Sequence, residues 1–114
     1  MKILSEKGFT LVELVVIIVI AGILLAVAVP KFLDLSNGAK AAACKQNQAA
    51  IETAAAVGFA DHAIDPATPA DYPTQGELTS EGYLDAFPTC PGDGTITYND
   101  TNGTADCSEA THKR

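Results

Sequence analysis

The sequence predicts an α+β fold, in which one long N-terminal α-helix is followed by a small antiparallel β-sheet. Three observations support this prediction. The chain of 114 residues begins with an apolar run from Phe9 to Val29 that contains a single charged residue, Glu13. Strong helix formers such as Ala, Lys and Gln dominate residues 31–60. Near the C-terminus, short β-prone stretches flank an Asn-Gly pair, which favours a hairpin turn.

The apolar run has two general interpretations. A secretory signal peptide has an apolar core of about 7–15 residues and an A-x-A-like cleavage site, whereas this run is longer and lacks that site. A membrane anchor fits better, because a helix of this length spans about 32 Å, close to the hydrocarbon thickness of a bilayer. Lys2 and Lys7 would then hold the N-terminus in the cytoplasm. A plain anchor leaves Glu13 unexplained, since a charge in hydrocarbon costs about 2.5–3.5 kcal/mol.

The stretch KGFTLVELVVIIVIAGILLAVAVPKF resembles the class III signal of type IV pilins and of the related pseudopilins. The resemblance implies that a dedicated membrane peptidase cuts after Gly8, removes residues 1–8 as a leader and methylates the new N-terminus at Phe9. It also implies that Glu13 meets the amino terminus of a neighbouring subunit in a filament. A buried carboxylate is tolerable beside such a cation, and the membrane-bound monomer offers none, so the cost of burying Glu13 favours assembly.

Gly22 and Pro30 mark the weak part of the apolar helix. Proline inside a helix removes one hydrogen bond and clashes with the preceding turn. In filaments of the family that the sequence resembles, this stretch is often extended, and we expect the same here. The alternative is a proline kink in an otherwise intact helix, so that residues 9–30 form one membrane and assembly helix.

Residues 31–60 are expected to continue the helix as an amphipathic segment, with a bend at the Ser-Asn-Gly sequence that ends at Gly38. One stripe at spacings of seven, four and four should face the small sheet: Cys44, Ile51, Ala55 and Phe59. The segment CKQNQAAIETA resembles a pattern found in one subgroup of pilins and pseudopilins. The resemblance implies a lollipop shape, in which the second half of the helix packs on the C-terminal sheet.

Residues 61–114 are expected to form a small globular domain. Three prolines within residues 60–77 predict a surface loop, because proline disfavours helix at its own position and at the one before. A short helix or turn should follow, with Thr79 or Ser80 as its cap. The apolar anchors expected in the core are Leu78, Tyr83, Leu84 and Phe87.

The three cysteines are candidates for stabilising a domain that has little apolar surface to bury. A hairpin with strands at residues 95–98 and 104–108 brings Cys107 back toward Cys90. A Cys90–Cys107 disulfide is therefore expected, and closing a loop of that size would contribute about 3 kcal/mol. Cys44 faces the core and is the alternative partner for either. The remaining cysteine would be a small buried thiol or would pair with another chain.

Oxygen-bearing side chains around the hairpin are weak candidates for calcium ligands: Asp93, Asn99, Asp100, Asn102 and Asp106. Type II secretion relatives bind calcium in this part of the fold. The spacing here is not that of an EF-hand, and turn chemistry explains these residues more simply, so we expect no bound metal. Two of them, Asn99 and Asn102, also begin N-x-[ST] sequons.

No enzymatic activity and no cofactor are expected. The sequence contains no H-E-x-x-H, no C-x-x-C and no glycine-rich phosphate loop, and His62 and His112 lie far apart. The net charge is −7, which argues against a nucleic-acid partner. The aromatic residues Phe9, Phe32 and Phe59 resemble positions proposed to conduct electrons in short pilins, but aromatic side chains at such spacings usually pack.

The function expected from the sequence is that of a major structural subunit of a type IV pilus. The precursor would sit in the lipid of the inner membrane and be processed by the prepilin peptidase. An inner-membrane assembly platform would then add it to a helical homopolymer on the cell surface, for adhesion, motility or DNA uptake. The alternative is a pseudopilin of a type II secretion or competence system, which forms a short periplasmic filament. A membrane-anchored binding module is disfavoured by Glu13.

Overall fold

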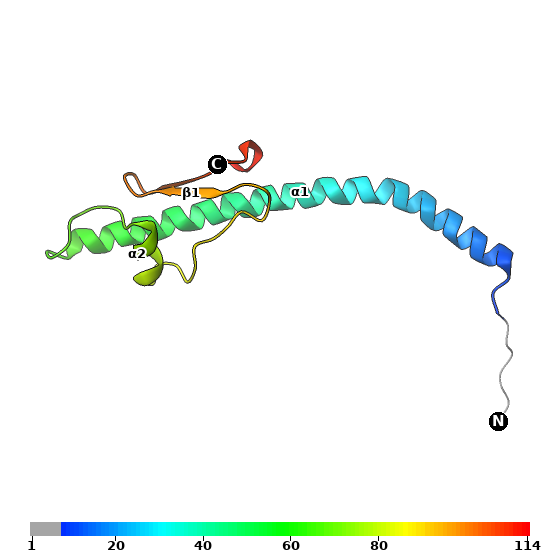
Figure 1. Ribbon diagram of the computed structural model, residues 1–114, viewed down its shortest axis with the longest axis horizontal. Coiled ribbons are helices and arrows are strands. Elements are labelled where there is room, and N and C mark those ends of the chain that lie inside the picture. Colours follow the sequence, from blue (N-terminus) through cyan, green and yellow to red (C-terminus); the bar gives the residue numbers. More distant parts are fainter. Residues whose placement is uncertain (1–7) are drawn as a thin grey trace, which may run out of the picture. The chain divides into compact units, whose positions relative to one another are not determined.

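The computed structural model describes residues 8–114, and the contacts within it divide the chain after Ser36 into two compact units, which are described separately. The leader residues 1–7, with Lys2 and Lys7, lie outside the described part. The predicted α+β class is confirmed (Figure 1). The elements are helix α1 (Leu11–Ile64), helix α2 (Gln75–Ser80), strands β1 (Ile96–Asn99) and β2 (Thr104–Cys107), and the 3-10 helix η1 (Ala110–His112).

The first unit contains the apolar half of α1, and this half is helical through Gly22 and Pro30. In the single chain this stretch is therefore helical, as in the alternative of an intact helix. Proline removes only one hydrogen bond, and the remaining bonds of the ladder hold the helix where nothing competes for them. Extension of this segment in a filament stays a prediction. The helix assignment also continues without interruption through Gly38, where a bend was expected.

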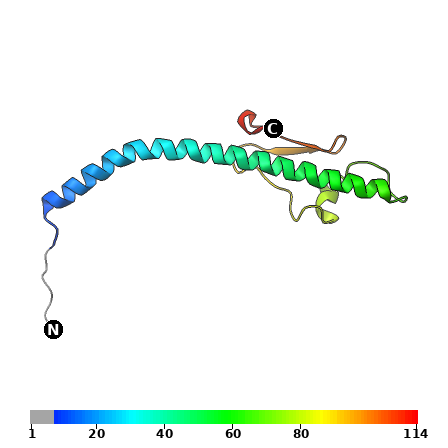
Figure 2. The same cartoon turned by 180° about the vertical axis from the view of Figure 1, so that it is seen from behind.

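The second unit pairs β1 with β2 in an antiparallel hairpin whose register runs from Ile96 opposite Cys107 to Asn99 opposite Thr104. β1 begins one residue later than expected. Gly103 closes the turn with a left-handed φ of 68°, and its N–H donates to the Asn99 carbonyl at 2.9 Å. Seen from the other side, the hairpin lies along the second half of α1 (Figure 2). The Ala105 N–H donates to a Glu52 carboxylate oxygen at 3.2 Å and ties the hairpin to this helix.

The core of the second unit lies between α1, α2 and the hairpin. Its buried apolar residues are Cys44, Ile51, Ala54, Ala55, Leu78, Ile96, Ala105 and Cys107. The predicted stripe on α1 is confirmed, because three of its members are in this core and Phe59 stacks on Tyr72 with ring centroids 4.8 Å apart. The other predicted anchors, Tyr83, Leu84 and Phe87, pack against the core while partly exposed.

The cap of α2 is Thr74, so the prediction of Thr79 or Ser80 is wrong. The Thr74 hydroxyl accepts from the Glu77 N–H at 3.4 Å, and the Glu77 carboxylate accepts from the Thr74 N–H at 2.7 Å. This is a capping box, and its T-x-x-E signature is present in the sequence. The helix begins earlier than expected, so that Thr79 lies in its last turn and donates to the Gly76 carbonyl.

The C-terminal end of α1 is tied to the segments that follow it by His62. Its Nδ1 lies 3.2 Å from an Asp71 carboxylate oxygen, and its Nε2 lies 3.4 Å from a Glu81 carboxylate oxygen. Burial acts to lower the pKa of His62, but hydrogen bonds and charge from the two carboxylates outweigh it and raise that pKa above its usual value. Protonated His62 therefore stabilises the folded second unit.

This linkage predicts a pH-dependent stability. The contribution of His62 should be complete below its unfolded pKa of about 6.5 and should be lost as the pH rises through the higher pKa of the folded state. Thermal unfolding of the full chain in detergent, compared with His62→Gln between about pH 5.5 and about pH 9, measures it. The wild type should lose its advantage over the variant as the pH rises. A difference in melting temperature that is the same throughout would show that the ion pairs contribute nothing.

Candidate assembly segment and cysteine–histidine cluster

The start of α1 is held by a reciprocal pair of hydrogen bonds between Thr10 and Glu13. The Thr10 N–H donates to the Glu13 carboxylate at 3.0 Å, and the Glu13 N–H donates to the Thr10 hydroxyl at 3.2 Å. Thr10 is thus the residue before the helix and Glu13 the third residue inside it, which is again a capping box. In the single chain, the Thr10 N–H therefore satisfies one oxygen of the Glu13 carboxylate. Among residues 8–114, no basic side chain forms an ion pair with it.

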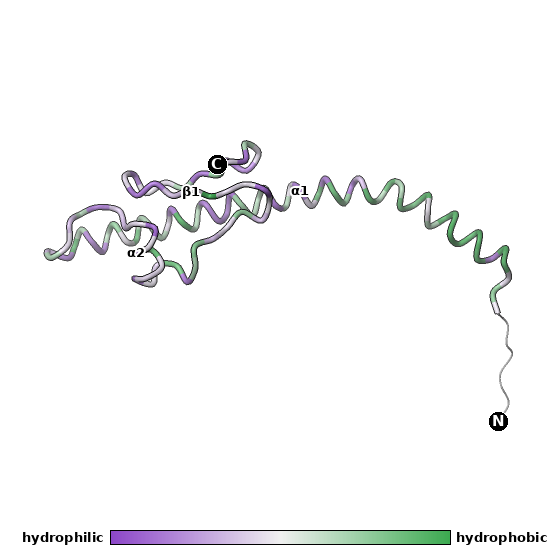
Figure 3. The backbone as a smooth tube through the Cα atoms, viewed as in Figure 1, coloured by the Kyte–Doolittle hydropathy of each residue, from purple (hydrophilic) through white to green (hydrophobic). Residues whose placement is uncertain are grey.

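From Leu14 to Val29, α1 carries no polar side chain on any face. Along α1, an 18-residue window reaches a mean hydropathy of 3.1 with none of it buried, so the helix is long and apolar enough to cross a membrane. Figure 3 shows this hydrophobic run at the start of the helix and the mixed character of the rest. A helix that is apolar on every side is normally covered by lipid or by other helices. Phe9, at the predicted cleavage site after Gly8, is 81% exposed.

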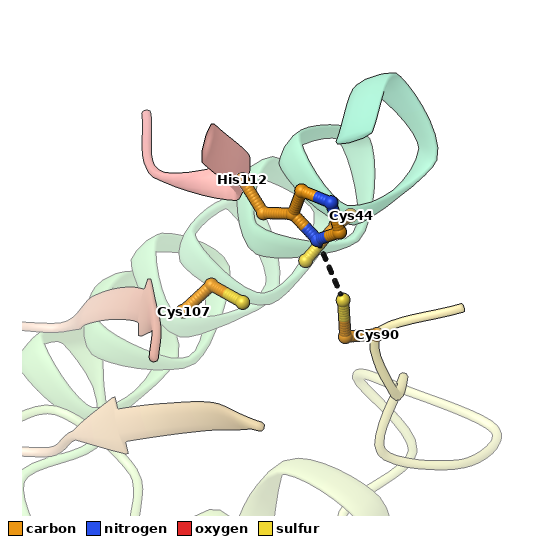
Figure 4. Close-up of side chains that lie close together, drawn as sticks. All are labelled: Cys44, Cys90, Cys107 and His112. Atoms are coloured by element: carbon orange, nitrogen blue, oxygen red, sulfur yellow. Dashed lines mark hydrogen bonds between the residues drawn. The ribbon is translucent and has the colours of Figure 1, made fainter. Parts of the chain in front are cut away.

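A second site, which the sequence analysis did not predict, lies in the second unit. It joins Cys44 on α1, Cys90 in the loop before β1, Cys107 at the end of β2 and His112 on η1 (Figure 4). The three sulfur atoms and one imidazole nitrogen all lie within 4.8 Å of one another. Cys90 Sγ lies 3.0 Å from His112 Nδ1. Cys44, Cys107 and His112 are buried.

The polar groups around this cluster fix its side chains. The amide of Gln48, which is fully buried, donates to Cys44 Sγ at 3.5 Å and to the His112 carbonyl at 2.7 Å. Burial acts to raise the pKa of Cys90, but hydrogen bonds from Cys44, His112 and the Gly92 N–H lower it to about 6. Burial, reinforced by the neighbouring thiols, raises the pKa of Cys44 to about 12. The Cys90 thiol, with its lowered pKa, therefore ionises more readily than that of Cys44.

Two glycines let the chain approach the cluster closely. A Cβ at Gly94 would lie 2.5 Å from Cys107 Sγ and 3.4 Å from Cys90 Sγ. A Cβ at Gly92 would lie 2.5 Å from the His112 ring. Both positions exclude any larger residue unless the cluster moves, because real Cβ atoms do not come this near to other heavy atoms. The loop from Cys90 is thus shaped to fit around the sulfur atoms.

The predicted disulfide between Cys90 and Cys107 is not formed in this structure, where all three cysteines are free thiols. The two residues do lie together, as expected, and Cys44 lies with them. His112 faces the thiols, which was not predicted. The signal for it was weak, because the ligands are far apart in the chain and match no C-x-x-C spacing.

The three aspartates among the calcium candidates, Asp93, Asp100 and Asp106, belong to no group of metal-ligating His, Cys, Asp and Glu side chains in the described residues. Within residues 8–114 the structure gathers one group of metal-ligating side chains, and it contains none of the predicted acidic residues. The Asn99 side chain accepts from the Thr101 N–H and that of Asn102 from the Thr104 N–H, as expected of turn residues. Asp106 accepts from the N–H of the next residue and pairs with Lys113 at 3.4 Å.

Comparisons with known proteins agree with an assembly segment at the N-terminus. The family model described as "Prokaryotic N-terminal methylation motif" matches residues 3–29. The type IV narrow pilus major component PilA5 of Thermus thermophilus is 51% identical over 54 residues, which are 47% of each chain. Type II secretion system core protein G of Pseudomonas aeruginosa is 31% identical over 97 residues, covering 76% of this chain and 68% of the relative.

A third relative, competence protein ComGC of Bacillus subtilis, is 28% identical over 88 residues, covering 77% of this chain and 84% of the relative. The chain spans about half the length of the pilins that it matches, namely 47% of PilA5 and 54% of a Pseudomonas aeruginosa fimbrial protein. No solved structure gives a significant match to the chain. The similarity therefore includes pilus, secretion and competence proteins alike.

Proposed function

This chain belongs to the family of type IV pilins and type II secretion pseudopilins, and on that premise we propose that it is the major structural subunit of a type IV pilus, with no catalytic role. The observation that supports assembly is the apolar first half of α1, which is exposed and carries one carboxylate, Glu13, in its first turn. Lipid covers such a surface in the precursor. In the filament, the corresponding surfaces of neighbouring copies cover it.

The proposed route begins with the precursor in the inner membrane. The prepilin peptidase removes residues 1–8 and methylates Phe9, and an assembly platform moves the helix from the bilayer into the filament. Glu13 then pairs with the amino terminus of the next subunit. The second unit, which carries most of the acidic residues, forms the filament's outer surface and keeps it soluble. The pilus role is supported by the identity with the PilA5 pilin over the aligned half.

The second candidate is a pseudopilin of a secretion or competence machine. It is favoured by coverage, because this chain spans 68% of the secretion protein G and 84% of the competence protein ComGC. Both candidates use the same N-terminal helix and the same processing. They differ in where the filament ends, on the cell surface or within the envelope.

Two variants separate the charge of Glu13 from its capping role. Glu13→Gln removes the charge, but glutamine also serves in a capping box, so the helix start survives. Breaking a buried ion pair by removing one partner costs about 3–5 kcal/mol. Because every 1.4 kcal/mol is about tenfold in an equilibrium, the subunit recovered in filaments should fall by about a hundredfold or more. Immunoblots of sheared filaments and of membranes from the same cells measure this.

Thr10→Ala is the matched control. It removes the hydroxyl half of the capping box and keeps the carboxylate, so helix stability should fall by about 0.5–2 kcal/mol while assembly continues. Processing of both variants should remain near wild type, as seen from their size on gels. The proposed role of the charge would be refuted if Glu13→Gln assembled normally and Thr10→Ala did not.

A further inference from the structure

We propose that Cys44, Cys90, Cys107 and His112 together bind one zinc ion, which stabilises the second unit. The four side chains come from α1, the loop before β1, the end of β2 and η1. No two of them are neighbours in sequence, so the fold itself brings the four ligand atoms within 4.8 Å of one another. This proposal is independent of filament assembly and concerns a different unit of the chain.

The ligand set and its spacing fit zinc. Three cysteines and one histidine form one of the usual ligand sets of structural zinc sites, and a tetrahedral ion with Zn–S near 2.3 Å and Zn–N near 2.0–2.1 Å places its ligand atoms about 3.5–3.8 Å apart. The observed separations, 3.0 Å for Cys90 and His112 and at most 4.8 Å for any pair, bracket this range. Shifts of about an ångström or less would complete the tetrahedron.

The orientation of the ligands also fits. In Figure 4, the Nδ1 of His112 and the three sulfur atoms point toward a common centre. Because all four positions are taken by protein atoms, the site has no open coordination position, which is typical of a structural rather than a catalytic zinc site. Displacement of the thiol protons gives three thiolates, and these protons pass to solvent as the ion binds.

Hydrogen bonds to two of these four residues also suit a metal site. Gln48 donates to Cys44 Sγ and to the carbonyl of His112, which fixes both ligands from the buried side. Such outer hydrogen bonds orient metal ligands and tune them. His112 also lines a surface groove together with Gly92 and Lys40, so one of the four ligands borders solvent.

The architecture supplies a reason for such an ion. The sheet has only two strands, and an isolated hairpin is marginally stable at best. The core has eight buried apolar residues, two of which are these cysteines. An ion held by all four side chains would link the loop, the hairpin and the C-terminal η1 to α1 at one point. A Cys90–Cys107 disulfide would join only the loop and the hairpin, and would connect neither of them to Cys44 on α1 or to His112 on η1.

The test is metal analysis of the full chain, purified in detergent without chelator and under anaerobic conditions. Native mass spectrometry and elemental analysis should find one zinc per chain and no disulfide. Exchange for cobalt should give the absorption bands of tetrahedral cobalt with thiolate ligands. A chelator should lower the melting temperature of the second unit, and added zinc should restore it.

Variants distinguish zinc from a disulfide and from nonspecific binding. His112→Ala should lose stoichiometric zinc, whereas His112→Cys should retain it, because four cysteines also form a zinc site. His62→Ala, at the histidine outside the cluster, is the matched control and should bind like the wild type. Gln48→Ala should weaken binding by about 10–100-fold.

Two results would overturn the proposal. One is a native chain that is two hydrogen masses lighter and free of metal, because that identifies a disulfide. The other is zinc binding by His112→Ala as tight as by the wild type. If His112→Ala did not fold, His112→Cys would still decide the matter, because a folded His112→Cys chain without zinc would count against the site.

Discussion

Replacing Ile51 by alanine is expected to lower the free energy of unfolding of the second unit by about 2–5 kcal/mol. Ile51 is fully buried and is the largest such side chain in the part of the chain that the structure describes. It lies on α1 in the core shared with α2 and the hairpin. Truncation leaves a cavity in a core of only eight buried apolar residues, and few neighbours are available to collapse into it.

The measurement is urea unfolding of the full chain in detergent, followed by the near-ultraviolet signal of tyrosine. The chain has no tryptophan, and its three tyrosines, Tyr72, Tyr83 and Tyr98, all lie in the second unit, so the membrane helix does not contribute to this signal. Val57→Ala is the control on the same helix. Val57 is 51% exposed, and its truncation should change stability by about 0.5 kcal/mol or less. Equal losses in both variants would contradict the described core.

Gly58→Ala is expected to destabilise the second unit by about 1–3 kcal/mol, although alanine is the better helix former. A Cβ at Gly58 would lie 2.2 Å from Cγ of Pro73 and 3.1 Å from the ring of Tyr83. Pro73 is fully buried, and its ring cannot turn away as a flexible side chain would. Helix α1 and the Pro73 loop would have to separate, which loosens the contact between α1 and the segment before α2.

Gly38→Ala is the matched control for this substitution. Nothing lies within 4 Å of a Cβ at Gly38, which is also inside α1. Alanine there should stabilise the helix by about 0.8–1.0 kcal/mol, the usual difference in helix propensity. The same unfolding experiment compares the two variants. If Gly58→Ala also raised stability, the close packing of α1 on Pro73 would be wrong.

The N-terminal half of this protein could be predicted because its signal is local. The apolar run, the glycine before Phe9 and the lone carboxylate Glu13 are adjacent in sequence, so no tertiary information is needed to recognise them. The stripe on α1 was likewise predicted, because helical spacing alone places its residues on one face. The hairpin could be located to within one residue from its Asn-Gly turn.

The parts that could not be predicted depend on contacts between distant segments. Nothing near Cys44 indicates that it meets His112, since the hairpin, the preceding loop and η1 must all fold first. The close packing of Pro73 against Gly58 likewise depends on the tertiary fold and has no local signal in the sequence. The cap of α2 could have been predicted, because the capping-box residues Thr74 and Glu77 are close in sequence. The prediction placed the start of this helix too late.

The measurement that tests the central claim most directly is intact mass spectrometry of filaments sheared from the cell surface. A type IV pilus subunit should appear there as a chain that begins at Phe9 and carries one added methyl group. The same processed chain found only in the cell envelope would instead identify a pseudopilin. A chain that still carries residues 1–8, in cells with an active prepilin peptidase, would contradict the account of how this protein is processed and assembled.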